Sequence, residues 1–210
     1  MTIRARTAFD ADYYEYYYGN KRTRAVAPED TVRQANFVLA YMAYIKLPVR
    51  QVLDVGCGLG LWQAPLLAQH PKAKYRGVEY SEFLCQKFGW IQSRAETYRD
   101  GRQYDLIICQ SVLQYLTDRQ TLQAIRNFAG MCRGALYLEA PTKKDWAQNV
   151  DRTSTDGNVN LRTAAWYRRA LKPYFVDAGG GLFVAMNRPP CFMNWKHAVN
   201  LGGAGHVLIP

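Results

Sequence analysis

The sequence has no hydrophobic run long enough to cross a membrane. A membrane-spanning helix needs about 20 consecutive apolar residues, and every apolar run in this chain of 210 residues is shorter. The first 14 residues lack the apolar stretch of a secretory signal peptide. We therefore expect a cytoplasmic protein without a membrane partner.

Cysteine and histidine are scarce, and their spacing favours neither disulfides nor a metal site. The five cysteines include no Cys-x-x-Cys pair, and His70, His197 and His206 show no metal-ligand spacing. Buried free thiols in a reducing compartment explain the cysteines better than a disulfide framework does. We expect no metal ligands.

Acidic residues are outnumbered, with 17 Asp and Glu against 27 Lys and Arg and a formal net charge of +10. Such a surplus suits an anionic partner such as RNA, a phosphorylated metabolite or an acidic carrier protein. The basic residues are scattered, however, and clusters such as residues 21–24 and 168–169 are short. Solubility explains the charge equally well, so RNA is kept as an alternative partner.

Strand and helix patterns alternate along the middle of the chain. Apolar runs at residues 52–55 and 104–109, each interrupted only by one aspartate, are typical of strands buried on both faces, and the segments between such runs predict helices. This alternation predicts an α/β fold with a parallel sheet and helices on both faces.

We expect one domain over residues 1–210, monomeric or homodimeric, with four parts. Residues 1–47 form a helical lead-in or lid, with a helix that begins at Pro28. Residues 48–141 form a ligand-binding core. Residues 142–186 supply a polar loop or cap, a helix and a terminal antiparallel hairpin, and residues 187–210 form a tail.

Three glycines follow the first predicted strand at alternate positions. Gly56, Gly58 and Gly60 precede a predicted helix, whose N-terminus attracts negative charge. Glu79 ends the second strand, where a carboxylate can accept hydrogen bonds from both hydroxyls of a ribose. The dinucleotide pattern G-x-G-x-x-G fails because Leu61 takes its last position, and no Gly-Lys-Ser/Thr phosphate loop follows.

Taken in order, the stretches "VLDVGCGLG", "GVEYS" and "YDLIICQSVLQYLTD" resemble the successive motifs of the class I S-adenosylmethionine-dependent methyltransferases, over roughly residues 49–141. The resemblance implies a Rossmann-like, doubly wound, mostly parallel seven-stranded sheet with an antiparallel C-terminal hairpin. It also implies that S-adenosyl-L-methionine is the cofactor and S-adenosyl-L-homocysteine the product. The methyl group would pass by in-line displacement to a small-molecule acceptor. The alternatives are an RNA methyltransferase and a cofactor-binding protein without transfer activity.

The resemblance also implies cofactor contacts, residue by residue. Asp54 and the backbone of the three glycines would hold the amino-acid part of the cofactor. Glu79 would bind the ribose hydroxyls, and Tyr80 would lie against the adenine. Gln110 would offer its backbone carbonyl to the methionine ammonium.

The adenine end departs from the family pattern. The stretch Ser93-Arg94-Ala95-Glu96 stands where the family often has an aspartate that binds the adenine amino group. Arg94 takes the position of that aspartate, so Ser93 or the backbone would have to substitute for it.

Acceptor residues are expected near the fourth strand and in the lead-in. "SVLQYL" resembles the "VLHHL" pattern of small-molecule methyltransferases, with Gln114 and Tyr115 in place of two histidines. Gln114 would orient the substrate by hydrogen bonding. In the tyrosine-rich lead-in, Tyr14 and Tyr17 belong to i, i+4 pairs on a predicted helix, and we expect them to line the pocket and position the acceptor. The alternative is that these rings pack the helix onto the domain.

Further acceptor candidates follow the fifth strand. Glu139 ends that strand, and Arg162 and Trp166 lie one helical turn apart under the expected cap. Arg162 could pair with an acceptor carboxylate or phosphate. The alternative is that Arg162 ties down a loop, through Asp151 or Asp156.

Overall fold

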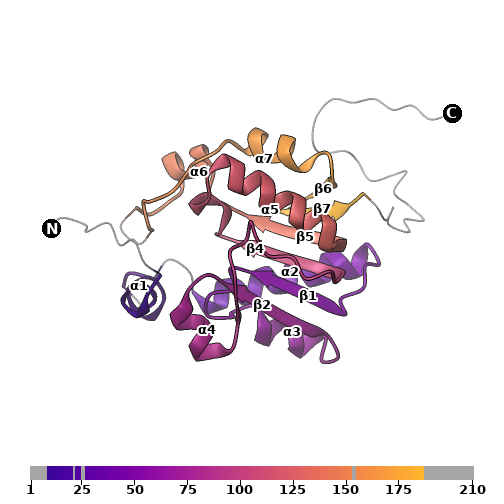
Figure 1. Cartoon of the computed structure of the whole chain (residues 1–210), viewed down its shortest axis with the longest axis horizontal. Helices are drawn as coiled ribbons and strands as arrows, with labels where there is room; N and C mark the ends of the chain where they lie inside the picture. Colours follow the sequence, from indigo (N-terminus) through magenta and orange to yellow (C-terminus); the bar gives the residue numbers. More distant parts are fainter. Residues whose placement is uncertain (1–8, 21, 25–26, 153–154, 187–210) are drawn as a thin grey trace.

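A computed structural model of the chain describes residues 9–20, 22–24, 27–152 and 155–186. The predicted tail at 187–210, with His197 and His206, lies outside the described residues. Seven strands form one sheet in the order β3-β2-β1-β4-β5-β7-β6 (Figure 1). The strands are β1 (Gln51–Val55), β2 (Lys74–Glu79), β3 (Ile91–Gln92), β4 (Tyr104–Gln110), β5 (Cys132–Glu139), β6 (Phe175–Gly179) and β7 (Leu182–Ala185).

The sheet is parallel except at its C-terminal edge. Strands β1 to β5 pair in parallel, and β7 pairs antiparallel with both β5 and β6. The mostly parallel seven-stranded sheet with an antiparallel terminal hairpin is therefore confirmed. The strand order reverses between β1 and β4, and open sheets bind ligands at the carboxyl ends of the strands around such a point.

The helices begin and end where local sequence signals occur. They are α1 (Ala11–Tyr14), α2 (Pro28–Tyr44), α3 (Gln63–Gln69), α4 (Glu82–Phe88), α5 (Asp118–Met131), α6 (Lys143–Gln148) and α7 (Ala164–Leu171), with a π-helix η1 (Glu15–Gly19) and a 3-10 turn η2 (Leu113–Tyr115). Pro28 opens α2 as expected, and Thr117 and Gln120 form a capping box at α5. The polar stretch after β5, expected to be a loop or cap, also contains the short helix α6, which a Thr142–Asp145 capping box begins.

Apolar side chains from the strands pack against helices on both faces of the sheet. One hydrophobic cluster joins strand residues such as Leu53, Ile107 and Leu136 to side chains of α5 and α7. The neighbouring residues of the same strands belong to a second cluster, with side chains of α2 and α3. The same division is visible in Figure 1, where α5 covers one face and α2 lies behind the sheet. This division explains the apolar runs in the sequence, because both faces of the strands are covered.

A third, smaller cluster joins the lead-in to the sheet. Tyr13 and Tyr14 of α1 pack against Leu84 of α4, and Figure 1 shows α1 beside α4 at one end of the sheet. Within the described part of the chain, no helix is long and apolar enough to cross a membrane.

Candidate functional site

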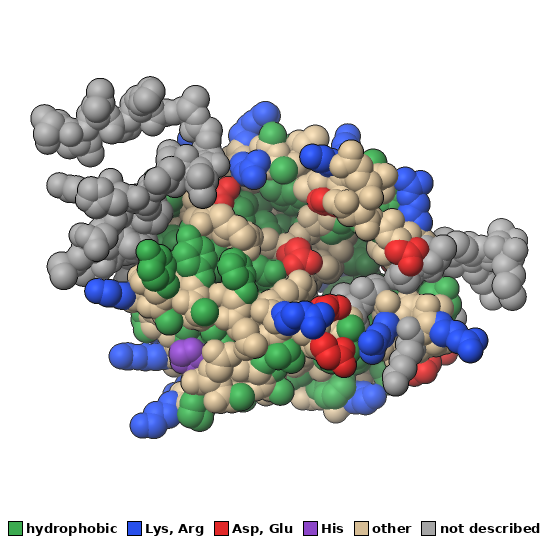
Figure 2. Space-filling model, turned by 180° about the vertical axis from the view of Figure 1, so that it is seen from behind, with side chains coloured by type: hydrophobic (Ala, Val, Ile, Leu, Met, Phe, Trp, Pro, Cys, Tyr) green, Lys and Arg blue, Asp and Glu red, His purple; other side chains and the backbone are tan. Residues whose placement is uncertain are grey.

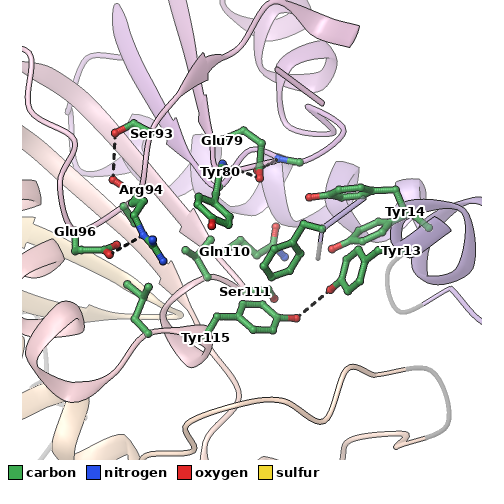
Figure 3. Close-up of a pocket in the computed structure, with 17 residues that line it drawn as sticks. Tyr13, Tyr14, Glu79, Tyr80, Ser93, Arg94, Glu96, Gln110, Ser111 and Tyr115 are labelled. Atoms are coloured by element: carbon green, nitrogen blue, oxygen red, sulfur yellow. Dashed lines mark hydrogen bonds and ion pairs between the residues drawn. The ribbon is translucent and has the colours of Figure 1, made fainter. Parts of the chain in front are cut away.

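A cavity lies over the carboxyl ends of β1, β2 and β4, with the lead-in on its far side (Figure 3). Its lining comes from five separate segments: Phe9, Tyr13, Tyr14, Tyr18, Gly56, Gly58, Glu79, Tyr80, Ser93, Arg94, Ala95, Glu96, Gln110, Ser111, Val112, Tyr115 and Leu116. A smaller cavity shares part of this lining and extends to Asp54 and Trp62. Of the residues assigned to the cofactor, all except Gly60 line one of the two cavities.

The glycine turn brings backbone to the cavity wall. Gly56 has a φ of +70°, and a Cβ atom there would lie 2.2 Å from Cγ2 of Val112. Gly60 has a similar φ, but it faces the ring of Trp90, which a Cβ would approach to 2.7 Å. Trp90 also donates from Nε1 to the carbonyl of Gly58, at 3.0 Å. Gly60 therefore makes room for an indole ring that buttresses the turn, and it does not line either cavity.

Glu79 is fixed by backbone amides at the end of β2. Its Oε1 accepts from the N–H groups of Tyr80 and Ser81 at 2.8 and 2.9 Å, and its Oε2 accepts from the N–H of Gly58 at 2.9 Å. The side chain is buried, with 6% of its surface exposed. A carboxylate held in this way keeps one orientation at the cavity wall, and Oε2, which accepts only one of the three bonds, has further acceptor capacity.

Asp54 is buried beneath the glycine turn. The hydroxyl of Tyr75 donates to its Oδ2. Burial raises the pKa of the Asp54 carboxyl to about 7, against the lowering effect of that hydrogen bond. Near neutral pH, Asp54 is therefore close to the balance between its neutral and charged forms.

Arg94, Tyr80 and Glu96 form a contact group at one end of the cavity (Figure 3). The Arg94 guanidinium lies 4.8 Å from the centroid of the Tyr80 ring, and its Nε lies 3.1 Å from Glu96 Oε1. Gln120 donates to the same Glu96 oxygen at 3.0 Å. The other oxygen, Glu96 Oε2, is buried without a hydrogen-bond partner among the described residues.

Glu96 was not assigned a role from the sequence. The available signal was an acidic residue two positions after Arg94, within the stretch where the family often has its adenine-binding aspartate. Ser93, which was assigned there, also lines the cavity, but its hydroxyl donates to the neighbouring carbonyl of Arg94.

The opposite side of the cavity is an aromatic wall, formed by Phe9, Tyr13, Tyr14, Tyr18 and Tyr115. The hydroxyls of Tyr13 and Tyr115 lie 3.1 Å apart and share a hydrogen bond. Burial raises the pKa of Tyr13, Tyr14 and Tyr115 above the usual range, and that of Tyr18 to about 12. These hydroxyls are thus protonated at neutral pH and can orient a ligand, but they do not supply a general base.

The structure separates the residues predicted to position the acceptor. Tyr14 and Tyr115 belong to the aromatic wall. Tyr17 lies outside the cavity lining and packs on Tyr13, with the ring centroids 4.7 Å apart, so Tyr18 occupies the place expected for it. Gln114 is buried behind the lining, where its backbone carbonyl accepts from the N–H of Asn160 at 2.7 Å.

Glu139 belongs to a hydrogen-bond chain beside the cavity. It accepts from Tyr137 Oη at 2.8 Å and from Gln34 Nε2 at 3.0 Å. Gln34 in turn accepts from Gln110 Nε2 at 2.7 Å, and Trp62 Nε1 donates to Gln110 Oε1 at 2.7 Å. Glu139 lies outside the lining of both cavities. The hydrogen-bond chain anchors α2 to the ends of β4 and β5.

Arg162 and Trp166 also lie outside the cavities, and Arg162 ties down loops. With 4% of its surface exposed, Arg162 donates to Asp118 Oδ1 at 2.7 Å and to the carbonyls of Leu113 and Leu116. Trp166 packs on its guanidinium at 4.9 Å. The assignment of Arg162 to the acceptor is corrected on this geometry, and the acid it contacts is Asp118, where the sequence had suggested Asp151 or Asp156.

In the part of the chain that the structure describes, no group of three or more His, Cys, Asp or Glu side chains could hold a metal ion.

Residues 53–134 match the family model described as a methyltransferase domain. Among curated proteins, the chain is 27% identical over 143 residues to a trans-aconitate 2-methyltransferase of Azoarcus sp., covering 59% of this chain and 56% of that protein. It is 34% identical over 79 residues to a ubiquinone biosynthesis O-methyltransferase of Rickettsia prowazekii, covering 33% of this chain and 31% of that protein. The chain thus spans about half or less of the curated relatives that it matches.

Solved structures share the fold. DesVI of Streptomyces venezuelae superposes with a TM-score of 0.60 at 18% identity, covering 83% of this chain and 97% of DesVI. The plantazolicin methyltransferase BpumL, solved in complex with SAH, superposes with a TM-score of 0.59 at 15% identity, covering 79% of this chain and 70% of BpumL. Residues 53–134 thus match a methyltransferase-domain model, and the chain shares the fold of these solved structures.

Proposed function

We propose that this protein transfers a methyl group from S-adenosylmethionine to a small-molecule acceptor. The observation that carries the proposal is the fixed carboxylate of Glu79. Three backbone amides aim it at the cavity, directly beside the glycine turn at the point where the strand order reverses. A carboxylate at this place accepts a hydrogen bond from a ribose hydroxyl, for which Oε2 has acceptor capacity.

The remaining lining fits the other parts of the cofactor. Backbone is exposed at Gly56 and Gly58, and the smaller cavity leads from them to Asp54, which suits the amino-acid part. Tyr80 and the unpartnered oxygen of Glu96 suit a planar base with an amino group. When bound, S-adenosylmethionine supplies a methyl group on a positively charged sulfur, and the chain's task is to align an acceptor with that methyl and to exclude water.

The aromatic wall performs these two tasks on the acceptor side. Its rings exclude water, and their faces attract the positive charge of a sulfonium. The protonated hydroxyls of Tyr13 and Tyr115 can hold an acceptor oxygen or nitrogen in line with the methyl group. An acceptor hydroxyl that loses its proton readily to solvent water needs no general base from the aromatic wall.

The wall favours a neutral, planar acceptor such as a phenol. The Azoarcus relative is named for trans-aconitate, a tricarboxylate, and binding three negative charges requires cationic side chains. Among the described lining residues, the only cation is Arg94, which lies at the Tyr80 end and is paired with Glu96. A tricarboxylate would therefore bury charges without partners.

RNA is the second acceptor class that the charge of the chain allows, but the described basic residues do not gather at the cavity. Lys74, Arg76, Arg102 and Arg133 line a hollow at the amino ends of β2, β4 and β5, at the opposite edge of the sheet. On the face seen in Figure 2, Lys and Arg side chains lie mainly around the outline, with Asp and Glu side chains between them. We therefore favour a small acceptor.

Calorimetric titration with S-adenosylmethionine and S-adenosylhomocysteine tests cofactor binding, and we expect micromolar dissociation constants. Transfer of a labelled methyl group is then measured to a panel of phenols, to trans-aconitate and to total RNA. Labelling of a phenol supports the proposal, and preferred labelling of RNA or trans-aconitate would contradict the acceptor class. Cofactor binding without transfer to any of these would favour a cofactor-binding protein that lacks transfer activity.

A further inference from the structure

The end of the cavity that suits a planar base is occupied by a side chain of the protein itself. The Arg94 guanidinium lies over the Tyr80 ring at 4.8 Å and forms an ion pair with Glu96 at 3.1 Å. Figure 3 shows Arg94 between these two side chains. Stacking on an aromatic face and donation of N–H groups to a carboxylate are also the two contacts that an adenine with its amino group would make.

The two partners of the ion pair differ in how firmly they are held. The Arg94 side chain is 52% exposed, so its guanidinium can move into solvent with little loss. The Glu96 side chain is 9% exposed and is fixed by α5: Gln120 donates to its carboxylate at 3.0 Å, and Asn127 donates to its backbone carbonyl at 2.8 Å. If Arg94 moves away, the carboxylate therefore stays in place.

We propose that Arg94 competes with adenine for Tyr80 and Glu96, and that the cofactor binds by displacing the Arg94 guanidinium. Glu96 then accepts the amino group of adenine, which fills the buried acceptor capacity of its unpartnered oxygen. The proposal rests on the proposed function, because it assumes that the ligand carries an adenine. Glu96 then provides selectivity for the adenine amino group, and Arg94 reduces the apparent affinity for the cofactor.

The proposal predicts that removal of Arg94 tightens binding. An exposed ion pair and a cation–π contact together keep the competing state populated, and the apparent dissociation constant rises as the open fraction falls. We expect Arg94→Ala to bind S-adenosylhomocysteine about five- to thirtyfold more tightly than the wild type. The control is Arg119→Ala, which removes the same charge from an exposed position on α5 and should leave the affinity within about twofold.

A ligand pair tests the role of Glu96 without any activity measurement. S-Inosylhomocysteine carries a carbonyl where S-adenosylhomocysteine carries the amino group, and a hydrogen on the neighbouring ring nitrogen N1; the rest of the molecule is the same. The wild type should prefer the adenine ligand by about tenfold or more, since a carbonyl facing a carboxylate leaves both acceptors without a donor. Glu96→Gln should lose most of this preference, because its amide can donate to the carbonyl.

The outcomes separate this inference from the proposed function. Unchanged or weaker binding by Arg94→Ala would overturn the competition. Equal loss of affinity for both ligands in Glu96→Gln would overturn the assignment of selectivity, while the wild type's binding of S-adenosylhomocysteine would leave the proposed function intact. Failure of the folded wild type to bind either ligand would overturn the proposed function and this inference with it.

Discussion

Replacement of Glu79 by glutamine tests the amide-held carboxylate directly. The carboxylate accepts from three backbone N–H groups, two on Oε1 and one on Oε2. A glutamine can keep its carbonyl on Tyr80 and Ser81, but its NH2 group then faces the N–H of Gly58. One buried donor is left without an acceptor, which costs about 1–3 kcal/mol, and the two remaining bonds lose their charge assistance.

We therefore expect Glu79→Gln to lower the free energy of unfolding by about 2–4 kcal/mol. Cofactor affinity should fall about tenfold or more, since a ribose hydroxyl loses a charged acceptor. The matched control is Glu82→Gln, the same change three residues away on the exposed first turn of α4. Among the contacts described, the Glu82 side chain accepts one hydrogen bond, from Gln86 Nε2 at 3.1 Å. The loss of stability in this control should stay below about 1 kcal/mol.

Urea unfolding followed by circular dichroism measures both variants, and titration calorimetry measures their affinities. The reasoning would be refuted if Glu79→Gln unfolded at the same urea concentration as Glu82→Gln, with an unchanged slope. Loss of stability with unchanged affinity would retain the amide cradle but remove Glu79 from the ribose.

Three further predictions follow from the site and its surroundings. Because burial raises the pKa of Asp54 from 3.8 to about 7, the folded state holds an extra proton between these pH values. The free energy of unfolding should therefore fall by up to about 4 kcal/mol as pH rises from about 4 to about 7. Urea unfolding across that pH range should show a flatter dependence for Asp54→Asn. Gly56→Ala should destabilise by about 2 kcal/mol more than Gly58→Ala, since both have a positive φ but only the former meets Val112; equal melting temperatures would contradict this. Arg162→Leu should cost about 2–6 kcal/mol, because it leaves the carbonyls of Leu113 and Leu116 without their guanidinium donor. Arg168→Leu, at a 67% exposed side chain paired with a 40% exposed acid, should cost less than about 1 kcal/mol in thermal unfolding.

The sequence predicted the sheet because its signals are local. Runs such as residues 104–109 specify buried strands, and the turn residues between them specify where each strand ends. The glycines and Glu79 could be placed at one end of the sheet for the same reason: parallel strands carry whatever follows them to a common edge. The terminal antiparallel hairpin was expected from residues 142–186, and the family resemblance implied the same hairpin.

The sequence could not show which polar side chains are already used by the fold. Arg162 was a candidate for the acceptor until the structure showed its contact with Asp118, 44 residues away. Glu139 was a candidate until it was found bonded to Gln34 of α2, 105 residues away. Glu96 was overlooked for the converse reason, since an unpartnered buried oxygen is recognised only when the packing around it is known.

The aromatic wall has a consequence for the time that a ligand stays bound. Phe9 is fastened to the sheet by Ser81 Oγ, which donates to its carbonyl at 2.5 Å, and Tyr13 by its bond to Tyr115. Ser81 also donates its N–H to Glu79, so the lead-in is coupled to the carboxylate that we propose for the ribose. We expect that weakening these contacts, and so loosening the lead-in, shortens the residence time of a ligand beneath the wall.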